Sequence, residues 1–300
     1  MAKKDSERSR CQWISMTEAL TAFVRNAEGH QGAGHIKPLH WYVACRLVIE
    51  GGFHPEDIRP RPPFNSIRRA GRWILTQDDS RSTGGERTVL GGLKTKNIDV
   101  VATKEGIGPV IAVSMKGTLN AFRNLTNRME EAVGDCTNLH IAYPALVYGF
   151  LHVLRANWEG DVDDPNDVAI LTDGTPSDGI ARYAKVMSRL AGRNDIRDVT
   201  TKYEAVSLCL VDPREQTVGS VLTGLFPGAE LLDFQDFFDC LYRQYDQRFL
   251  YAAPLLAKTT RRVAWSPNSP ALANWIHAEY SPRLDHGSAE PDEDLAPPNS

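Results

Sequence analysis

The chain has 300 residues, of which 42% are hydrophobic and 24% charged, and its formal net charge is −4. These values are typical of a globular protein with a large core, and they exclude a disordered chain, a fibrous repeat and binding of nucleic acid through overall positive charge. No apolar run is long enough to cross a membrane, and the five scattered cysteines form no CxxC pair. We therefore expect a cytoplasmic protein without disulfides or structural zinc.

The N-terminal segment, residues 1–85, is expected to be helical at first and then irregular. Residues 17–51 contain two helical patterns, the second of which ends at Gly51 and Gly52. Residues 54–88 are rich in Pro, Arg, Gly and Asp, which predicts loops with at most a short helix near 67–75. Arginines are concentrated in this segment and either contact phosphate or form a solvated surface: Arg59, Arg61, Arg68, Arg69 and Arg72.

The pattern changes after residue 95. Apolar runs of strand length alternate with helical patterns, the strands at 98–103, 110–113, 145–154 and 205–211 and the helices at 119–136, 180–190 and 234–250. This order predicts an α/β fold over residues 86–280, with a central mixed sheet flanked by helices on both faces. Residues 281–300 are acidic and rich in proline, which predicts a disordered tail.

The first two of these strands are predicted to form a hairpin, because two glycines lie in the short link between them. If the turn is centred between Gly106 and Ile107, facing residues have numbers that sum to 213, and Asp99 lies opposite Ser114. Lys116 then shares a face with Ser114 and lies diagonally beside Asp99. An aspartate and a lysine thus converge on an otherwise apolar hairpin.

The helix over 119–136 is expected to add a carboxylate to this place. Glu130 lies at the shoulder of the apolar stripe that packs on the sheet, so it can reach Asp99 and Lys116. Glu131 lies nearer the solvent side. Glu131 and Asp135 form a like-charge pair four residues apart, which is unfavourable unless a cation is near, and we interpret Asp135 as part of a solvated face.

Two carboxylates and a lysine at a sheet edge suit the hydrolysis of a phosphodiester with Mg²⁺. Carboxylates hold this oxygen-preferring cation, which polarises a phosphoryl oxygen and acidifies a bound water. A lysine can hold that water and stabilise the developing charge.

At this point the chain resembles the PD-(D/E)xK nuclease superfamily. Ser114-Met115-Lys116, followed after thirteen residues by Glu130, is similar to the S-x-K-x13-E variant of some Type II restriction endonucleases. In that variant a helix glutamate supplies the ligand that the strand serine lacks. This chain departs from the family pattern at Ile98, a position where the family usually has proline.

The resemblance implies a restriction-endonuclease-like core and a role for each matching residue. Asp99 and Glu130 would bind Mg²⁺, Met115 would offer its backbone carbonyl to the metal, and Lys116 would position the attacking water. Ser114 would replace the usual strand carboxylate. The alternative is a purely structural hairpin.

Polar residues between the lysine and the glutamate are candidates for contacts with DNA bases, because Arg reads guanine and Asn reads adenine in the major groove. They are Arg123, Asn124, Asn127 and Arg128. The alternative is that Arg128 pairs with Glu131 or Asp135 on the helix surface. Glu50, at the end of the early helix, resembles in position a helix glutamate that many such nucleases add to the metal site, but we favour its interpretation as an exposed residue at a helix end.

Two further patterns are not interpreted as sites. His30, His35 and His40 recur every five residues, which is not a usual metal spacing. Residues 91–95 contain a Gly-Gly pair and a lysine, but a strand follows where a phosphate-binding loop needs a helix.

These features predict a Mg²⁺-dependent endonuclease that hydrolyses double-stranded DNA, as a sequence-specific Type II restriction enzyme working as a homodimer or tetramer. Two alternatives remain open: a non-catalytic DNA-binding module with a decayed nuclease fold, and a non-specific nuclease of another defence or repair system.

Overall fold

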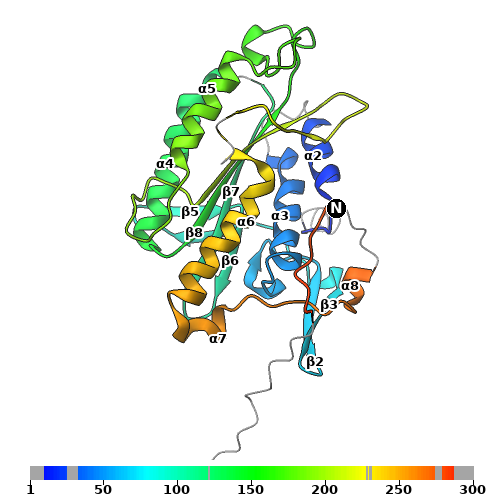
Figure 1. Ribbon diagram of the computed structural model, residues 1–300, viewed down its shortest axis with the longest axis vertical. Coiled ribbons are helices and arrows are strands. Elements are labelled where there is room, and N and C mark those ends of the chain that lie inside the picture. The colour runs from blue at the N-terminus through cyan, green and yellow to red at the C-terminus, as the bar shows by residue number, and fades with distance from the viewer. Residues whose placement is uncertain are drawn as a thin grey trace, which may run out of the picture.

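The protein is described by a computed structural model that covers residues 10–25, 33–120, 122–227, 229, 232–273 and 279–286. The side chain of Arg123 and residues 287–300 of the expected acidic tail lie outside this description. Within it, six strands form a mixed sheet in the order β1-β6-β7-β8-β9-β10, with helices on both faces (Figure 1). The α/β architecture predicted from the sequence is confirmed at this level.

The strands of the central sheet are β1 (Ile58–Arg59), β6 (Val100–Lys104), β7 (Gly108–Thr118), β8 (Val147–Arg155), β9 (Ala205–Val211) and β10 (Val221–Leu222). Neighbours β7, β8 and β9 are parallel, and the outer pairings are antiparallel. Two further hairpins are β2 (Phe64–Arg69) with β3 (Arg72–Gln77), and β4 (Arg87–Leu90) with β5 (Thr95–Ile98).

The helices are α2 (Met16–Arg25), α3 (Lys37–Ile49), α4 (Leu125–Ala142), α5 (Asp178–Met187), α6 (Phe234–Tyr245), α7 (Ala257–Thr260) and α8 (Pro270–Ala273). A π-helical segment, Asp246–Tyr251, follows α6. Within the described residues, no helix is both long enough and apolar enough to cross a membrane.

The sheet separates two apolar cores. One core lies between the sheet and helices α2, α3 and α6, and the other lies between the sheet and helices α4 and α5. Strands β8 and β9 are buried along almost their whole length because both of their faces are covered. Their near-continuous apolar sequences follow from this burial.

The hairpin β6–β7 has the predicted register at its open end. Val100 pairs with Val113 and Val101 with Ala112, so the facing numbers sum to 213. A bulge after Ala102 shifts the pairing by one residue toward the turn.

The prediction of loops and a short helix near 67–75 is wrong, because residues 64–77 form the hairpin β2–β3. Ala70 and Gly71 at its turn both have positive φ, of 48° and 77°, as a two-residue hairpin turn requires. On the inner face, Phe64 packs against Trp13 with ring centroids 4.9 Å apart. The Arg and Gly content concealed the period-two alternation of these strands.

A turn between β4 and β5 docks on α4. Asn138 of α4 accepts hydrogen bonds from the amides of Leu93 and Lys94 through Oδ1, and its Nδ2 donates to the Lys94 carbonyl. A side chain at Gly91 would collide with Asn138. The Gly-Gly pair that superficially suggests a phosphate-binding loop therefore serves close packing.

Gly117, which follows Lys116 on β7, marks another close approach. A Cβ atom there would lie 2.6 Å from the Phe23 ring and 3.1 Å from Nε2 of His35. The N-terminal helices therefore pack directly on the backbone beside the candidate lysine.

The final described segment, 279–286, packs on the body although residues 281–286 belong to the expected tail. The Arg283 amide donates to the Ile49 carbonyl, and the Trp265 amide donates to the Arg283 carbonyl.

Candidate functional site

Asp99 lies between β5 and β6, at the end of the sheet where β6 begins. Its Oδ2 accepts a hydrogen bond of 2.6 Å from the backbone amide of Met115, while its Oδ1 has no hydrogen-bond partner among the described residues. Burial raises the pKa of Asp99, and the Met115 amide and the positive charge of Lys116 offset this only in part. The carboxylate is thus held by the neighbouring strand and keeps one oxygen for another partner.

Lys116 extends from β7 toward α4, on the face that it shares with Ser114. Its Nζ donates to Oε1 of Glu131 at 2.7 Å. Burial raises the pKa of Glu131, but the hydrogen bond and the charge of Lys116 outweigh it, so this pKa lies below its ordinary value. The ammonium group uses one of its three donors in this contact.

The structure corrects the expected carboxylate. Glu130 lies on the exposed side of α4 that faces α5, where it borders a cavity with Met129 and Arg182. Glu131 occupies the opposite flank and contacts Lys116, so the helix is rotated by about one residue relative to the sequence expectation. The reason is the β4–β5 hairpin, which covers this flank of α4 and which the apolar pattern did not indicate.

Asp135 does not belong to a solvated face, contrary to the expectation from the sequence. It is 4% exposed and forms an ion pair with Lys96 of β5. Each member of the like-charge pair therefore has a lysine partner: Lys116 pairs with Glu131, and Lys96 pairs with Asp135. Both lysines also favour the ionised form of Asp99.

Ser114 and Met115 precede Lys116 on β7. The Ser114 side chain does not converge on Asp99 as the sequence predicted. The Ser114 hydroxyl is buried and forms a hydrogen bond of 2.8 Å with the Tyr148 hydroxyl. The Met115 side chain lies in the core on the other face of the sheet, and its amide contacts Asp99. The role expected for the Met115 carbonyl stays a prediction.

His40 and Glu86 join Asp99, although the sequence pattern led us to set His40 aside as a metal ligand and gave no indication of Glu86. Among the described residues, these three form a group whose possible ligand atoms all lie within 4.8 Å of one another. His40 comes from α3 and Glu86 from the segment before β4, so residues far apart in the chain meet at one end of the sheet. No local spacing could have indicated this group.

His40 is suited to binding a cation. It is 4% exposed, and its Nε2 has no hydrogen-bond partner in the described part of the chain. Burial lowers its pKa to about 4, so the ring is neutral near pH 7 and a nitrogen lone pair is free. An imidazole and two carboxylates provide a donor set for a divalent cation.

The polar residues at the start of α4 lie at the surface. Asn124 and Asn127 are exposed, and Arg128 lies 3.8 Å from Oε2 of Glu131, which is the surface pairing left open by the sequence. The predicted contacts of Arg123, Asn124, Asn127 and Arg128 with DNA stay predictions.

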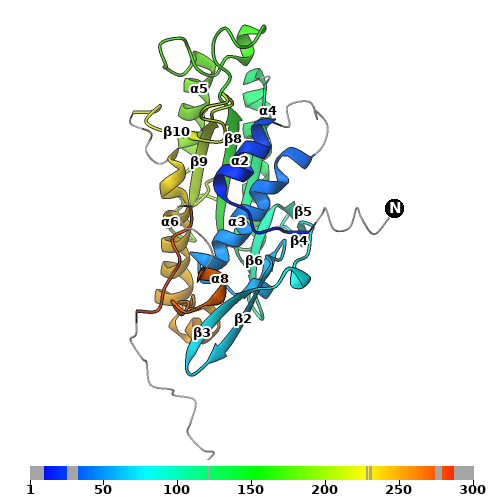
Figure 2. The ribbon, with the colours of Figure 1, turned by 90° about the vertical axis from the view of Figure 1, so that its right-hand side faces the viewer.

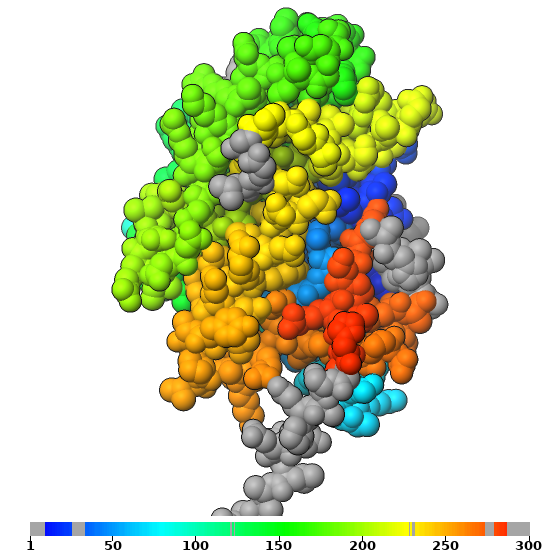
Figure 3. Space-filling model, viewed as in Figure 1, coloured from blue at the N-terminus to red at the C-terminus, as the bar shows by residue number. Residues whose placement is uncertain are grey.

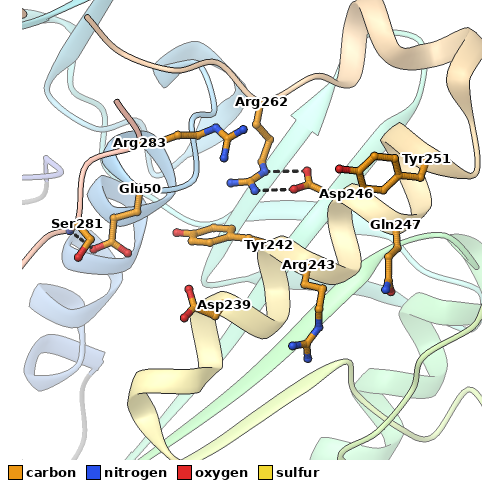
Figure 4. Close-up of a pocket in the computed structure, with 10 residues that line it drawn as sticks. All are labelled: Glu50, Asp239, Tyr242, Arg243, Asp246, Gln247, Tyr251, Arg262, Ser281 and Arg283. Carbon is orange, nitrogen blue, oxygen red and sulfur yellow. Dashed lines mark hydrogen bonds and ion pairs between the residues drawn. The ribbon is translucent and has the colours of Figure 1, made fainter. Parts of the chain in front are cut away.

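Glu50 belongs to a different place. It accepts hydrogen bonds from Nε of Arg46 at 2.6 Å and from the Ser281 amide at 2.8 Å, and burial raises its pKa. It lines a cavity of about 630 Å³ between α3, α6 and the segment 279–286, visible as a hollow in Figure 3. Figure 4 shows Tyr242 between Glu50 and the paired Arg262 and Asp246.

Glu50 is therefore not a neighbour of Asp99, because it lies ten residues along α3 from His40, about 15 Å of helical rise. The early helix approaches Asp99 through His40 instead. No protein-family model matches the chain, and no curated protein or solved structure shows significant similarity to it.

Proposed function

We propose that this protein is a divalent-metal-dependent endonuclease that hydrolyses double-stranded DNA. The observation that carries the proposal is the meeting of three features at one end of the sheet. These are the half-satisfied carboxylate of Asp99, the lysine two positions after Ser114, and the neutral imidazole of His40 beside Asp99.

Asp99, His40 and Glu86 would hold the cation. When bound there, the cation would polarise a phosphoryl oxygen and acidify a bound water. Mg²⁺ is the proposed ion because two of the three donors are carboxylates. Since imidazole nitrogen also suits transition metals, Mn²⁺ is the second ion to test.

Lys116 would position the attacking water and stabilise negative charge on the phosphate. The Lys116 side chain is 25% exposed, so it is accessible from solvent, and two donors of its ammonium group remain available beyond the contact with Glu131. Its charge already acts on Asp99.

Glu131, rather than Glu130, is the helix carboxylate that we assign to this site. Its hydrogen bond fixes the Lys116 ammonium toward α4, and we propose that it is a positioning residue. The swapped-glutamate mechanism that the resemblance implied for Glu130 is not part of the proposal, because Glu130 faces α5.

The first test is cleavage of a linear DNA of several kilobases with Mg²⁺, with Mn²⁺ and with EDTA. We expect metal-dependent cleavage by the parent and none by Asp99→Asn, which keeps the size of the side chain. Asp236→Asn, a change at an exposed aspartate of α6, is the matched control and should cleave like the parent.

Discrete fragments would support a sequence-specific Type II enzyme, and a smear would support a non-specific nuclease. A folded parent that cleaves neither methylated nor unmethylated DNA with either ion would contradict the proposal. Calorimetric titration with Mn²⁺ separates the causes, because Asp99→Asn should bind the ion more weakly than Asp236→Asn.

A further inference from the structure

The β2–β3 hairpin extends from the body as a two-stranded ribbon. Figures 1 and 2 show it at the end of the molecule opposite α5. Six residue pairs, from Phe64 with Gln77 to Arg69 with Arg72, give it a length of about 20 Å. Its inner face packs on Trp13 and on the α8 region, so the ribbon is anchored to the body.

Positive charge is concentrated at this tip. Arg69 lies directly opposite Arg72 across the two strands, and Arg68 precedes them. All three are exposed. The Arg72 side chain is 49% exposed, and its Nε lies 3.7 Å from Oδ2 of Asp285. Like charges directly opposite each other destabilise a hairpin, so this arrangement indicates an anionic partner.

The basic character continues to the base of the ribbon. Residues 59–87 contain seven arginines and three acidic residues, a net charge of +4 in a chain whose total is −4. At the base, burial and the charges of Arg61 and Arg87 lower the pKa of Arg59. Nε of Arg61 is buried without a hydrogen-bond partner among the described residues.

Both ends of the ribbon segment attach beside the candidate site. Arg59 of β1 pairs with Val101 of β6, two residues after Asp99. At the other end, Glu86 lies beside Asp99 itself. The arginines at the base of the ribbon therefore lie between its tip and the end of the sheet that carries Asp99.

From these observations we infer that the β2–β3 ribbon binds double-stranded DNA, with Arg68, Arg69 and Arg72 contacting phosphates at the rim of the major groove. A two-stranded ribbon fits this groove, which is about 12 Å wide and 8.5 Å deep. The major groove of an RNA duplex is too narrow for it. The inference rests on the proposed function for the identity of the substrate, but binding can be tested without cleavage.

The experiment measures binding of a fluorescent 30-base-pair DNA duplex in EDTA over a series of salt concentrations. The test variant combines Arg69→Ala with Arg72→Ala, and a second variant changes Arg68 to Ala. The matched control combines Arg182→Ala on α5 with Arg189→Ala in the 3-10 turn that follows α5, and both arginines are exposed. Circular dichroism and thermal unfolding verify that each variant is folded.

We expect the double ribbon variant to bind about 10- to 100-fold more weakly at 150 mM salt. The slope of log affinity against log salt should fall in magnitude by about two, because each lost phosphate contact contributes about 0.9. The α5 control should keep the parent's affinity and slope. An RNA duplex of the same sequence should bind more weakly than the DNA.

Several results would overturn the inference: a ribbon variant with the parent's affinity and salt slope, equal binding of RNA and DNA duplexes, or ribbon-dependent binding to anionic lipid vesicles without binding to DNA. Failure of the proposed function looks different. A parent that binds DNA through the ribbon but never cleaves it would contradict the nuclease and leave the ribbon assignment intact.

Discussion

Two clusters in this molecule pair a glutamate with basic side chains, and they differ in how fully the glutamate is satisfied. Each oxygen of Glu204 has two partners: Oε1 contacts Arg193 and Arg248, and Oε2 contacts the Tyr148 amide and His140. The side chains of Glu204 and Arg193 are 0% exposed. At the candidate site, the Glu131 side chain is 41% exposed, and one oxygen of Asp99 has no hydrogen-bond partner in the described part of the chain.

This difference teaches that charge density alone does not indicate a functional site. The Glu204 cluster joins the segment before β9 to β8 and to the π-helical segment, and it has no room for a further ligand on its carboxylate. The candidate site has fewer internal contacts, solvent access and spare donors and acceptors. We therefore expect changes in the first cluster to affect stability and changes in the second to affect activity.

The largest expected effect is on activity. Lys116→Ala should slow DNA cleavage by about 10²–10⁴-fold, the range for a group that assists proton transfer or charge stabilisation. Its unfolding free energy should change by less than about 1 kcal/mol, because the ion pair with Glu131 is partly exposed. Single-turnover cleavage and urea unfolding measure the two quantities.

Lys185→Ala on the exposed side of α5 is the control for this variant. DNA binding by Lys116→Ala should stay within about tenfold of the parent. Cleavage at a rate comparable to the parent's would remove Lys116 from the site.

Glu204→Gln should show the reverse pattern. It leaves Arg193 and Arg248 buried without a balancing charge, so we expect a loss of about 3–5 kcal/mol in unfolding free energy. The rate of cleavage per folded molecule should be unchanged at low temperature. A loss below about 1 kcal/mol would show that the buried cluster does not hold the sheet and the π-helical segment together.

The comparison of adjacent glutamates on α4 should give an intermediate effect. Glu131→Gln loses the charged partner of Lys116, and we expect cleavage about 10- to 100-fold slower, as for residues that orient a functional group. Glu130→Gln is the matched control and should stay within about twofold of the parent. Measuring the pH profile distinguishes the cases, since loss of Glu131 should alter the pH dependence as well as the rate. The opposite ranking of the two variants would restore the sequence-based choice of Glu130.

The smallest expected effect concerns His152, which pairs with Lys116 across β7 and β8. It is fully buried, and burial lowers its pKa from 6.5 to about 3, with the charges of Arg128 and Lys116 acting in the same direction. The folded protein keeps the ring neutral, whereas the unfolded chain takes up a proton below about pH 6.5. Stability is therefore complete above pH 6.5 and is lost as the pH falls, by up to about 1.4 kcal/mol per pH unit.

Urea unfolding at pH 7.0, 6.0 and 5.0 measures this loss. In His152→Gln the unfolding free energy should depend less steeply on pH. The decrease in slope should correspond to one fewer proton taken up on unfolding, whatever the variant's stability at pH 7. His286→Gln, at an exposed position, is the control. An unchanged slope in His152→Gln would show that His152 does not contribute to acid sensitivity.

The sequence predicted the central part of the fold because local patterns determine it. Apolar runs located β6 to β9, and the register near Val100 and Val113 followed from the two glycines of the turn. The hairpins β2–β3 and β4–β5 were missed because arginines and glycines interrupt their alternation. Without β5 beside α4, the sequence pattern placed Glu131 and Asp135 toward solvent.

The candidate site was predictable only where its residues are neighbours in the β6–β7 hairpin. The amide of Met115 contacts Asp99, one residue beyond the Ser114 position that the register placed opposite it, and Lys116 lies on the expected face. His40 and Glu86 could not be found, since their position depends on how α3 and the segment before β4 pack. Glu131 rather than Glu130 contacts Lys116, because a helical pattern defines a face only to within about one residue.

Gly117 connects the candidate lysine to the N-terminal helices in a way that concerns folding cooperativity. Because the Phe23 ring and His35 pack where a side chain would be, β7 has its final environment only after these helices have docked. Amide hydrogen exchange of β7 should therefore report on the docking of α2 and of the segment that contains His35, and local opening of these elements should expose the backbone next to Lys116. We therefore expect the N-terminal helices and the strand that carries the lysine to open together, although they lie far apart in the chain.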